Sequence, residues 1–393
     1  MRFSANLSDF NKILQKTLPA MPRKSTIPIL EHLNFSLTGN RLRVIATDQD
    51  ITIMSMMNVD GMEEGNVLVP GKRLNDIVRA LENKGTFEFH SNEENFEISI
   101  ITSFGQYGMK GLNPEEYLDL PELFQSEKPS LETETTKENE QSGSKSASFT
   151  KDEIIRLADK TYFAVSTDEF RPAMTGVLFQ FRETYVNAVS TDSFRLVKAV
   201  CKSDKPKYPN ELNVILPSRT IDLLRKIDND LLMSFIENQK KITHARFDFG
   251  ETILITRVID EKFPPYEAVI PSEYKMTVKV NKSEFLSSIR RVSIFTSSIS
   301  NQIKLELENN EISITGEDED SGSKALEKIK CDYNKEKYLI GFNFKYLEDA
   351  LHNIDDENEE VAISFTEQNR PAIIKASEDS DDLLMLIMPV RLN

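Results

Sequence analysis

The chain has 393 residues, of which 39% are hydrophobic and 28% charged, and this composition is typical of a soluble globular protein with two to four domains. No apolar run is long enough to cross a bilayer, and residues 1–7 lack the apolar core of a signal peptide. Taken alone, the net charge of −16 argues against binding to nucleic acid, and two distant cysteines, Cys201 and Cys331, suit the reducing cytoplasm.

The N-terminal part of the chain predicts one helix followed by strands. Apolar residues recur at helical spacing over residues 9–18, between the candidate N-cap Ser8 and the candidate terminator Pro19. Alternating or apolar runs then predict strands at 31–37, 41–46, 51–57 and 67–70, a helix at 72–81, and strands at 87–89 and 96–100.

Residues 126–147 differ from the rest of the chain because they are polar and nearly free of large apolar side chains. Such a segment cannot bury enough apolar surface to offset the entropy of ordering it. We therefore expect a flexible linker at 126–147, which acts as a tether without a partner of its own.

The remaining chain repeats the order of the first part. Helices are expected at 151–161, 219–225, 283–292 and 344–351, and strands at 214–217, 232–236, 253–258, 275–280, 338–341, 361–365 and 383–389. A strand, a helix and two further strands thus occur three times, with Pro70, Pro217 and Gly341 as apparent counterparts. We expect an α+β fold of three similar domains, 1–125, 148–271 and 272–393, each with two helices packed on curved antiparallel sheet.

Short motifs spread over all three domains resemble one known family. They are Thr-Ile-Pro-Ile-Leu at 26–30, Ala-Thr-Asp at 46–48, Phe-Arg at 170–171 before Gly-Val-Leu-Phe at 176–179, Ser-Thr-Asp-Ser-Phe-Arg-Leu at 190–196, Phe-Pro-Pro-Tyr at 263–266, Gly-Phe-Asn at 341–343 and Met-Pro-Val-Arg-Leu at 388–392. In this order and spacing they are similar to the bacterial DNA polymerase III beta subunits, the sliding clamps that act as processivity factors.

The resemblance implies a head-to-tail homodimer that closes into a ring of DNA-clamp domains. Sheets would form the outside, helices would line the hole, and duplex DNA would pass through without being read in sequence. The ring would tether the DNA polymerase III alpha subunit, the clamp loader and other proteins that carry a clamp-binding motif. Neither catalysis, a cofactor, a metal nor a membrane contact is implied.

The charges of the predicted helices agree with a hole that accepts DNA. With their flanking residues, the six helical segments hold 18 cations and 11 anions, a net charge of +7, so the rest of the chain carries −23. A basic lining inside an acidic shell would tolerate phosphates within the hole and repel DNA outside it. The alternative is that exposed helices simply carry more Lys and Arg than strands do.

By resemblance, the DNA-facing residues are Lys24, Lys72, Arg79, Arg219 and Arg225. The loop 168–173 departs from the family pattern, so a DNA contact there is left open.

The resemblance also implies a hydrophobic pocket for an extended partner peptide between the second and third domains. Its residues would be Met174, Thr191, Ser193, Phe194, Arg195, Leu196, Pro264, Val269, Tyr346, Met388, Pro389, Val390, Arg391 and Leu392. The apolar members would form its floor, and Arg195 and Arg391 could anchor backbone carbonyls or an acidic flank. The alternative for the apolar members is an ordinary buried core.

The dimer interface would join Tyr107 and Met109 of one copy to Ile294 and Phe295 of the other. Burial of both pairs in the cores of their own domains is the alternative.

The sequence disfavours one other class of function and leaves a second one open. An enzyme is disfavoured because the four histidines are scattered, and because neither a phosphate-binding glycine loop nor a nucleophile elbow is present. The acidic run 317–320 lacks the spaced ligands of a calcium loop. A scaffold of three repeats that binds only proteins stays open, since it would share the peptide pocket without needing a basic lining.

Overall fold

The computed structural model describes residues 1–22, 24–82, 84–118, 145–239, 241–355, 359–376 and 382–392. The chain forms two compact units. Unit 1 contains Met1–Lys151 and Ile227–Val258, and unit 2 contains Asp152–Lys226 and Ile259–Asn393. The predicted middle domain, 148–271, contributes to both units. Most of the predicted linker lies outside the described residues, but its last two residues, Ser146 and Ala147, belong to a strand.

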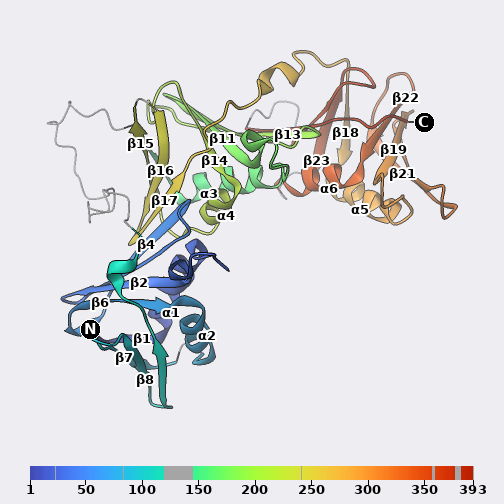
Figure 1. Ribbon diagram of the computed structural model, residues 1–393. Coiled ribbons are helices and arrows are strands. Elements are labelled where there is room, and N and C mark those ends of the chain that lie inside the picture. Colours follow the sequence, from blue (N-terminus) through green and yellow to red (C-terminus); the bar gives the residue numbers. More distant parts are fainter. Residues whose placement is uncertain are drawn as a thin grey trace. The chain divides into compact units, whose positions relative to one another are not determined.

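Unit 1 contains two antiparallel sheets (Figure 1). The five-stranded sheet has the order β5 (Asp60–Glu63), β1 (Arg2–Asn6), β7 (Thr86–Ser91), β8 (Glu97–Ile101) and β9 (Gln106–Lys110). The eight-stranded sheet has the order β10 (Ser146–Phe149), β15 (Leu231–Asn238), β16 (Lys241–Phe249), β17 (Thr252–Arg257), β4 (Ile51–Asn58), β3 (Arg41–Thr47), β2 (His32–Thr38) and β6 (Gly65–Pro70). Strand β9 is therefore an edge of its sheet.

Helices α1 (Leu7–Thr17) and α2 (Gly71–Ala80) belong to unit 1 and contact each other. The N-cap of α1 is Asn6, whose side chain accepts a hydrogen bond from the Ser8 backbone N–H at 2.9 Å, so the prediction of Ser8 as the cap was wrong. The helix starts earlier than predicted because Leu7 is already buried. Phe10 then packs on the sheet, with its ring centroid 4.8 Å from that of Phe87.

Unit 2 is built on one twelve-stranded antiparallel sheet. Its order is β14 (Leu212–Pro217), β11 (Gly176–Arg182), β12 (Tyr185–Thr191), β13 (Arg195–Lys202), β25 (Leu383–Ile387), β24 (Ala372–Lys375), β23 (Glu360–Phe365), β18 (Met276–Asn281), β21 (Ser323–Asp332), β20 (Glu311–Asp318), β19 (Gln302–Glu308) and β22 (Tyr338–Asn343). The helices of this unit are α3 (Lys151–Tyr162), α4 (Ser218–Leu224), α5 (Lys282–Ser293) and α6 (Phe344–His352), and α5 and α6 contact each other (Figure 1).

The helix caps give the correct alignment of the three repeats. Helices α2, α4 and α6 begin directly after Pro70, Pro217 and Asn343, which stand at their N-caps. The apparent match of Gly341 with Pro217 was therefore wrong by two residues. The Asn343 side chain accepts a hydrogen bond from the Lys345 N–H at 3.0 Å, which explains why an asparagine can replace the proline here.

Three rows of paired residues run across the equivalent strands. They are Leu68–Asn34–Ile45–Met54, Ile215–Leu178–Val189–Lys198 and Gly341–Lys304–Thr315–Leu326. The first residue of each row also pairs with a later segment of the chain: Leu68 with Leu112, Ile215 with Ile259, and Gly341 with Val390.

Two strand pairings extend these rows, β4 with β17 in unit 1 and β13 with β25 in unit 2. Each joins a strand of one repeat to a strand of the next and is called a joint. Met54 pairs with Ile253, six positions before Ile259, and Lys198 pairs with Leu384, six positions before Val390. The two joints therefore have the same register. Each is covered by buried apolar side chains, among them Met54 and Ile253 in the first, and Leu196 and Leu386 in the second.

Among the described residues, no helix is long and apolar enough to span a membrane.

Candidate functional site

A tight turn between β12 and β13 displays the aromatic residue of the predicted peptide pocket. The Asp192 carboxylate accepts hydrogen bonds from the backbone N–H groups of Phe194 and Arg195, both at 2.9 Å. Ser193 takes a φ of 78°, a left-handed conformation that this capping supports. The turn holds Phe194 outward, with 59% of its surface exposed, although the ring is large and apolar.

Three other segments contact this turn. The ring of Tyr346, on α6, is stacked beside that of Phe194 with centroids 6.3 Å apart. The Ser193 hydroxyl lies 3.4 Å from the sulfur of Met174, in the 3-10 helix η6 (Pro172–Thr175). The Met388 backbone N–H donates to the Phe194 carbonyl at 2.8 Å, so the segment after β25 is fixed to the same turn.

Arg195 is fully engaged inside the protein. Its guanidinium donates to Asp192 at 3.0 Å, to the Phe163 carbonyl at 2.7 Å and to Asp349 on α6. It also lies over the ring of Tyr346, 4.8 Å from the centroid, and over that of Phe163 at 5.3 Å. These contacts leave little capacity for a peptide carbonyl or an acidic flank, so Arg195 positions Tyr346 and Phe194 rather than serving as an anchor.

A buried apolar cluster underlies the turn. It consists of Leu178, Val189, Leu196, Ile215, Phe263, Tyr266, Ile373 and Leu386, with Ala173, Ile259, Ile270, Leu384 and Met388 packed against it. Leu196 is only 3% exposed, and Thr191 is also buried, where its hydroxyl donates to the Arg195 carbonyl at 2.7 Å. These two predicted pocket residues therefore support the surface from below.

Pro264 and Val269 lie in a short segment that packs over this cluster. Pro264 precedes the 3-10 helix η7 (Tyr266–Val269), and the Tyr266 hydroxyl donates to Gln180 at 2.9 Å. Val269 is 49% exposed at the end of η7, as an outward apolar side chain. Burial raises the pKa of Tyr266 well above its ordinary value, so its hydroxyl stays a proton donor.

The segment from Met388 to Leu392 connects the turn to strand β22. The Val390 N–H donates to the Gly341 carbonyl at 2.9 Å. A Cβ added to Gly341 would lie 2.7 Å from Leu392 Cδ2 and 3.0 Å from Val390 Cγ2, so glycine allows this contact without a shift of those side chains. Leu392 also lines a cavity of about 410 Å³ with residues of β19 and β20, whereas Arg391 is exposed.

The geometry brings Met174, Ser193, Phe194, Tyr346 and Met388 directly together. Sequence reasoning gave no supporting role to Phe163 or Asp349, and it named Phe263 and Tyr266 only as part of a family motif. Asp349 follows Tyr346 by three positions on α6 and so lies on the same helix face, which is the one local signal that pointed to it. Nearby, Phe170 in the loop 168–173 is 97% exposed.

Four of the five predicted DNA-facing residues are exposed. Lys24, Lys72 and Arg79 are exposed in unit 1, and none of them forms an ion pair with a described residue. Lys72 and Arg79 stand seven positions apart on α2, which places them two turns apart on one face. On α4 of unit 2, Arg219 is exposed.

Arg225, which follows α4, is different because its charge is already neutralised. It donates to Asp159 at 2.5 Å, lies 3.5 Å from Asp222, and covers the ring of Tyr162 at 4.8 Å. Its contribution to a positive surface is therefore small.

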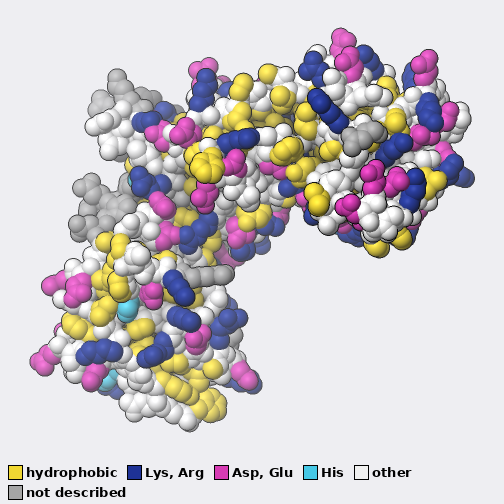
Figure 2. Space-filling view, turned by 45° about the vertical axis from the view of Figure 1, so that its right-hand side comes forward, with side chains coloured by type: hydrophobic (Ala, Val, Ile, Leu, Met, Phe, Trp, Pro, Cys, Tyr) yellow, Lys and Arg dark blue, Asp and Glu magenta, His cyan; other side chains and the backbone are white. Residues whose placement is uncertain are grey.

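Several other cations of the predicted lining are also committed to protein contacts. Lys16 pairs with Asp228 at 2.7 Å, Lys160 with Asp355 at 2.5 Å, and Arg290 with Glu348 at 2.8 Å. Lys282 is buried and donates to the Ile354 carbonyl at 2.5 Å. On the face seen in Figure 2, basic and acidic side chains are interspersed on each unit. The net of +7 therefore overstates the positive charge available to phosphates, and α2 retains the clearest share of it.

The four residues predicted at the dimer interface have different environments. Met109 on β9 is buried at 6% exposure and Tyr107 is half-buried, so Met109 is part of its own core. Ile294 and Phe295, just after α5, are 77% and 42% exposed. Exposed apolar side chains of this size on one helix end are a signature of a contact surface.

Comparison with known families shows that three successive parts of the chain match the three domains of one family. Residues 1–121 match the N-terminal domain of the DNA polymerase III beta subunit, residues 148–265 its central domain and residues 267–391 its C-terminal domain.

Individual relatives agree over the full length. The beta sliding clamp of Staphylococcus epidermidis is 28% identical over 404 residues, covering 100% of this chain and 99% of that protein, and that of Staphylococcus aureus is equally similar. The crystal structure of the DNA polymerase sliding clamp from Bacillus subtilis superposes with a TM-score of 0.86 at 26% identity, covering 100% of both chains. The clamp structure from Pseudomonas aeruginosa has the same fold, with a TM-score of 0.86 at 23% identity and complete coverage of both chains.

Proposed function

Since this chain belongs to the DNA polymerase III beta subunit family, the sliding clamps, we propose that it closes as a head-to-tail homodimer around duplex DNA. In the cytoplasm the ring would tether the replicative polymerase and other replication or repair proteins, without chemistry of its own. Retention on DNA would come from encirclement, so binding would be weak and independent of sequence.

The observation that carries this proposal is the repeated joint. Strand β4 pairs with β17, and β13, the equivalent of β4, pairs with β25 in the same register. In the third repeat the equivalent strand is β21. Within the part of the chain that the structure describes, residues 323–330 of β21 pair on one side only, with β20. The strand equivalent to β17 and β25 is β9, the edge of the five-stranded sheet. The free edges of β21 and β9 therefore belong to strands whose equivalents pair with each other in the two joints. Two copies of the chain could pair β21 of each copy with β9 of the other.

A joint of β21 with β9 brings the predicted interface residues into its neighbourhood. Ile294 and Phe295 follow α5, which contacts β21, and Tyr107 is on β9 itself. Burial of the exposed side chains of Ile294 and Phe295 against the partner would supply the apolar part of the contact.

Partner proteins would bind at the surface around Phe194, Tyr346 and Met388. An extended peptide with large apolar side chains fits there, because the surface combines exposed aromatic rings with an adaptable methionine over a firm apolar floor. Exposed Arg391 is the cation available to an acidic flank of that peptide. We propose that the polymerase alpha subunit and the clamp loader compete for this one surface.

Retention on nicked circular DNA, loaded with the matching clamp loader and ATP, tests the proposal. The protein should stay on the circle and leave once the circle is linearised. Equal retention on circular and linear DNA would mean ordinary surface binding. Loss from both, with an active loader confirmed on another clamp, would favour a scaffold that binds only proteins.

A further inference from the structure

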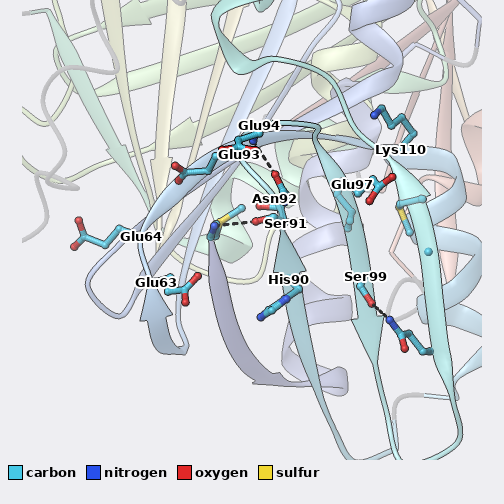
Figure 3. A pocket seen from close by; sticks show the side chains of 15 residues that line it. Glu63, Glu64, His90, Ser91, Asn92, Glu93, Glu94, Glu97, Ser99 and Lys110 are labelled. Atoms are coloured by element: carbon cyan, nitrogen blue, oxygen red, sulfur yellow. Dashed lines mark hydrogen bonds between the residues drawn. The ribbon is translucent and has the colours of Figure 1, made fainter.

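The outer face of the five-stranded sheet carries an acidic groove beside β9. This groove, of about 1050 Å³, is lined by Glu63, Glu64, Glu93, Glu94 and Glu97, all of them exposed (Figure 3). Its wall also contains the Met1 ammonium, His90 and Lys110, and the five carboxylates outnumber these basic groups. The Met1 ammonium donates to the Ser91 carbonyl at 3.1 Å and Lys110 to that of Asn95. Excess negative charge thus stands next to an unpaired strand edge.

Strand β21 presents charge of the opposite sign. Its alternation leaves Lys324, Leu326, Lys328 and Lys330 exposed, while Ile329 and the half-buried Glu327 face the other side. Among the described residues Lys324 pairs with Glu317 alone, at 3.3 Å, and both side chains are more than half exposed. Such a pair contributes little and can exchange for another carboxylate.

The two joints within the chain predict the register of the third. The residues equivalent to Leu326 are Met54 and Lys198, which pair with Ile253 and Leu384. Each of these partners lies six positions before the residue that pairs with the first residue of its own repeat's row. In the first repeat that residue is Leu112, and six positions before it is Gln106. Leu326 of one copy would therefore lie opposite Gln106 of the other. Two residues further along, Lys324 would lie opposite Gly108.

Gly108 leaves room at this point. It lines the groove, and a Cβ added to it would meet no atom within 4 Å. The equivalent residues of the inner joints are Ile255 and Leu386, whose side chains fill the same position with apolar atoms. A lysine stem can pass over a glycine and keep its ammonium beyond it.

We propose that Lys324 of one copy crosses Gly108 of the other and places its ammonium in the acidic groove beside Glu97. This inference rests on the proposed dimer and adds its register and its chemistry. The joints within each chain are sealed by apolar clusters, whereas the joint between copies is held on its outer face by charge. Ring closure is then sensitive to ionic strength at this joint alone.

Cysteine pairing tests the register. A mixture of Gly108→Cys and Lys324→Cys chains, oxidised with diamide, should give a disulfide between copies, because directly opposed residues lie within disulfide range. Gln106→Cys mixed with Lys324→Cys is the matched control, displaced by two residues and expected to cross-link at least about fivefold less. Burial raises the pKa of the native Cys331 thiol to about 11 and also raises that of Cys201, so background reaction should be slow. Preferential cross-linking of the control pair would overturn the register.

Charge reversal tests the contact. Lys324→Glu should raise the dimer Kd by on the order of tenfold, and adding Glu97→Lys should restore most of it. Lys335→Glu, an exposed change of the same charge away from this strand, should leave the Kd unchanged. The wild-type Kd should rise steeply between about 0.05 and 0.5 M NaCl, and that of Lys324→Glu much less. A dimer indifferent to Lys324→Glu and to salt would refute this inference alone, whereas a wild-type chain that sediments only as a monomer would refute the dimer itself.

Discussion

At the scale of single residues, Arg195 connects three segments that would otherwise be independent. Its side chain is only 13% exposed, and it bonds to the β12–β13 turn, to the segment after α3 and to α6. Arg195→Ala would leave Asp192 partly buried without its cation. We expect the free energy of unfolding of unit 2 to fall by about 2–4 kcal/mol in urea titrations.

Arg391→Ala is the matched control for that change. Arg391 is exposed on the same surface, so its removal should alter stability by no more than about 0.5 kcal/mol. Equal stabilities of the two variants would contradict the supporting role given to Arg195.

Phe194 is the residue whose loss should separate partner binding from folding. Because 59% of its surface is exposed, Phe194→Ala should change the stability by less than about 0.5 kcal/mol. It should nevertheless weaken binding of a fluorescent peptide from the polymerase alpha subunit by at least about tenfold, measured by anisotropy, because exposed aromatic anchors dominate such contacts. An unchanged peptide Kd would place the partner surface elsewhere.

At the scale of elements, α2 and the end of α4 should differ in their importance for DNA. Lys72→Glu with Arg79→Glu reverses two cations on one face of α2 and should slow loading onto DNA by on the order of tenfold, with a smaller salt dependence. Arg225→Gln removes a cation that two carboxylates already neutralise. Its effect on loading should be slight and its effect on thermal stability the larger one. The opposite order, measured by loader-dependent retention on circles, would reject α2 as the principal DNA-facing helix.

The helices were predictable because each carries its own periodic apolar face, and all six are present within a few residues of their expected bounds. The sequence pattern did not predict the ends of all elements correctly. Ser8 looked like a cap, yet buried Leu7 extends α1 back to Asn6. The linker seemed to include Ala147, but alternate burial of Ala147 and Phe149 makes them part of β10.

The family resemblance named residues that the structure brings together around Phe194, but the sequence did not reveal what supports them. Asp349 and Phe163 are far from Arg195 in sequence, and a contact of that kind leaves no periodic signal. The joints β4·β17 and β13·β25 were hidden for the same reason, since a pairing between distant strands depends on the whole fold rather than on either segment.

At the scale of the whole molecule, the dimer can be tested without disturbing the fold. Ile294 is 77% exposed, so Ile294→Asp should leave the circular dichroism spectrum and thermal unfolding of the subunit almost unchanged. It should convert the dimer into a monomer in sedimentation equilibrium, because a carboxylate would have to be buried at the joint. Met109 is unsuitable for this purpose, since its substitution would damage a core. A persistent dimer in Ile294→Asp would contradict the interface.

The matching registers of β4·β17 and β13·β25 have a consequence for assembly. Were the repeats separate chains, every joint of the ring would need its own bimolecular encounter, at the low concentration of a free subunit. Linking three repeats in one polypeptide makes β4·β17 and β13·β25 intramolecular, with effective concentrations that reach about the millimolar range for short tethers. In the proposed ring, only the contact of β21 with β9 would need a bimolecular encounter. Carrying three repeats in one polypeptide would therefore make most joints independent of protein concentration and confine any opening of the ring to the two β21–β9 contacts.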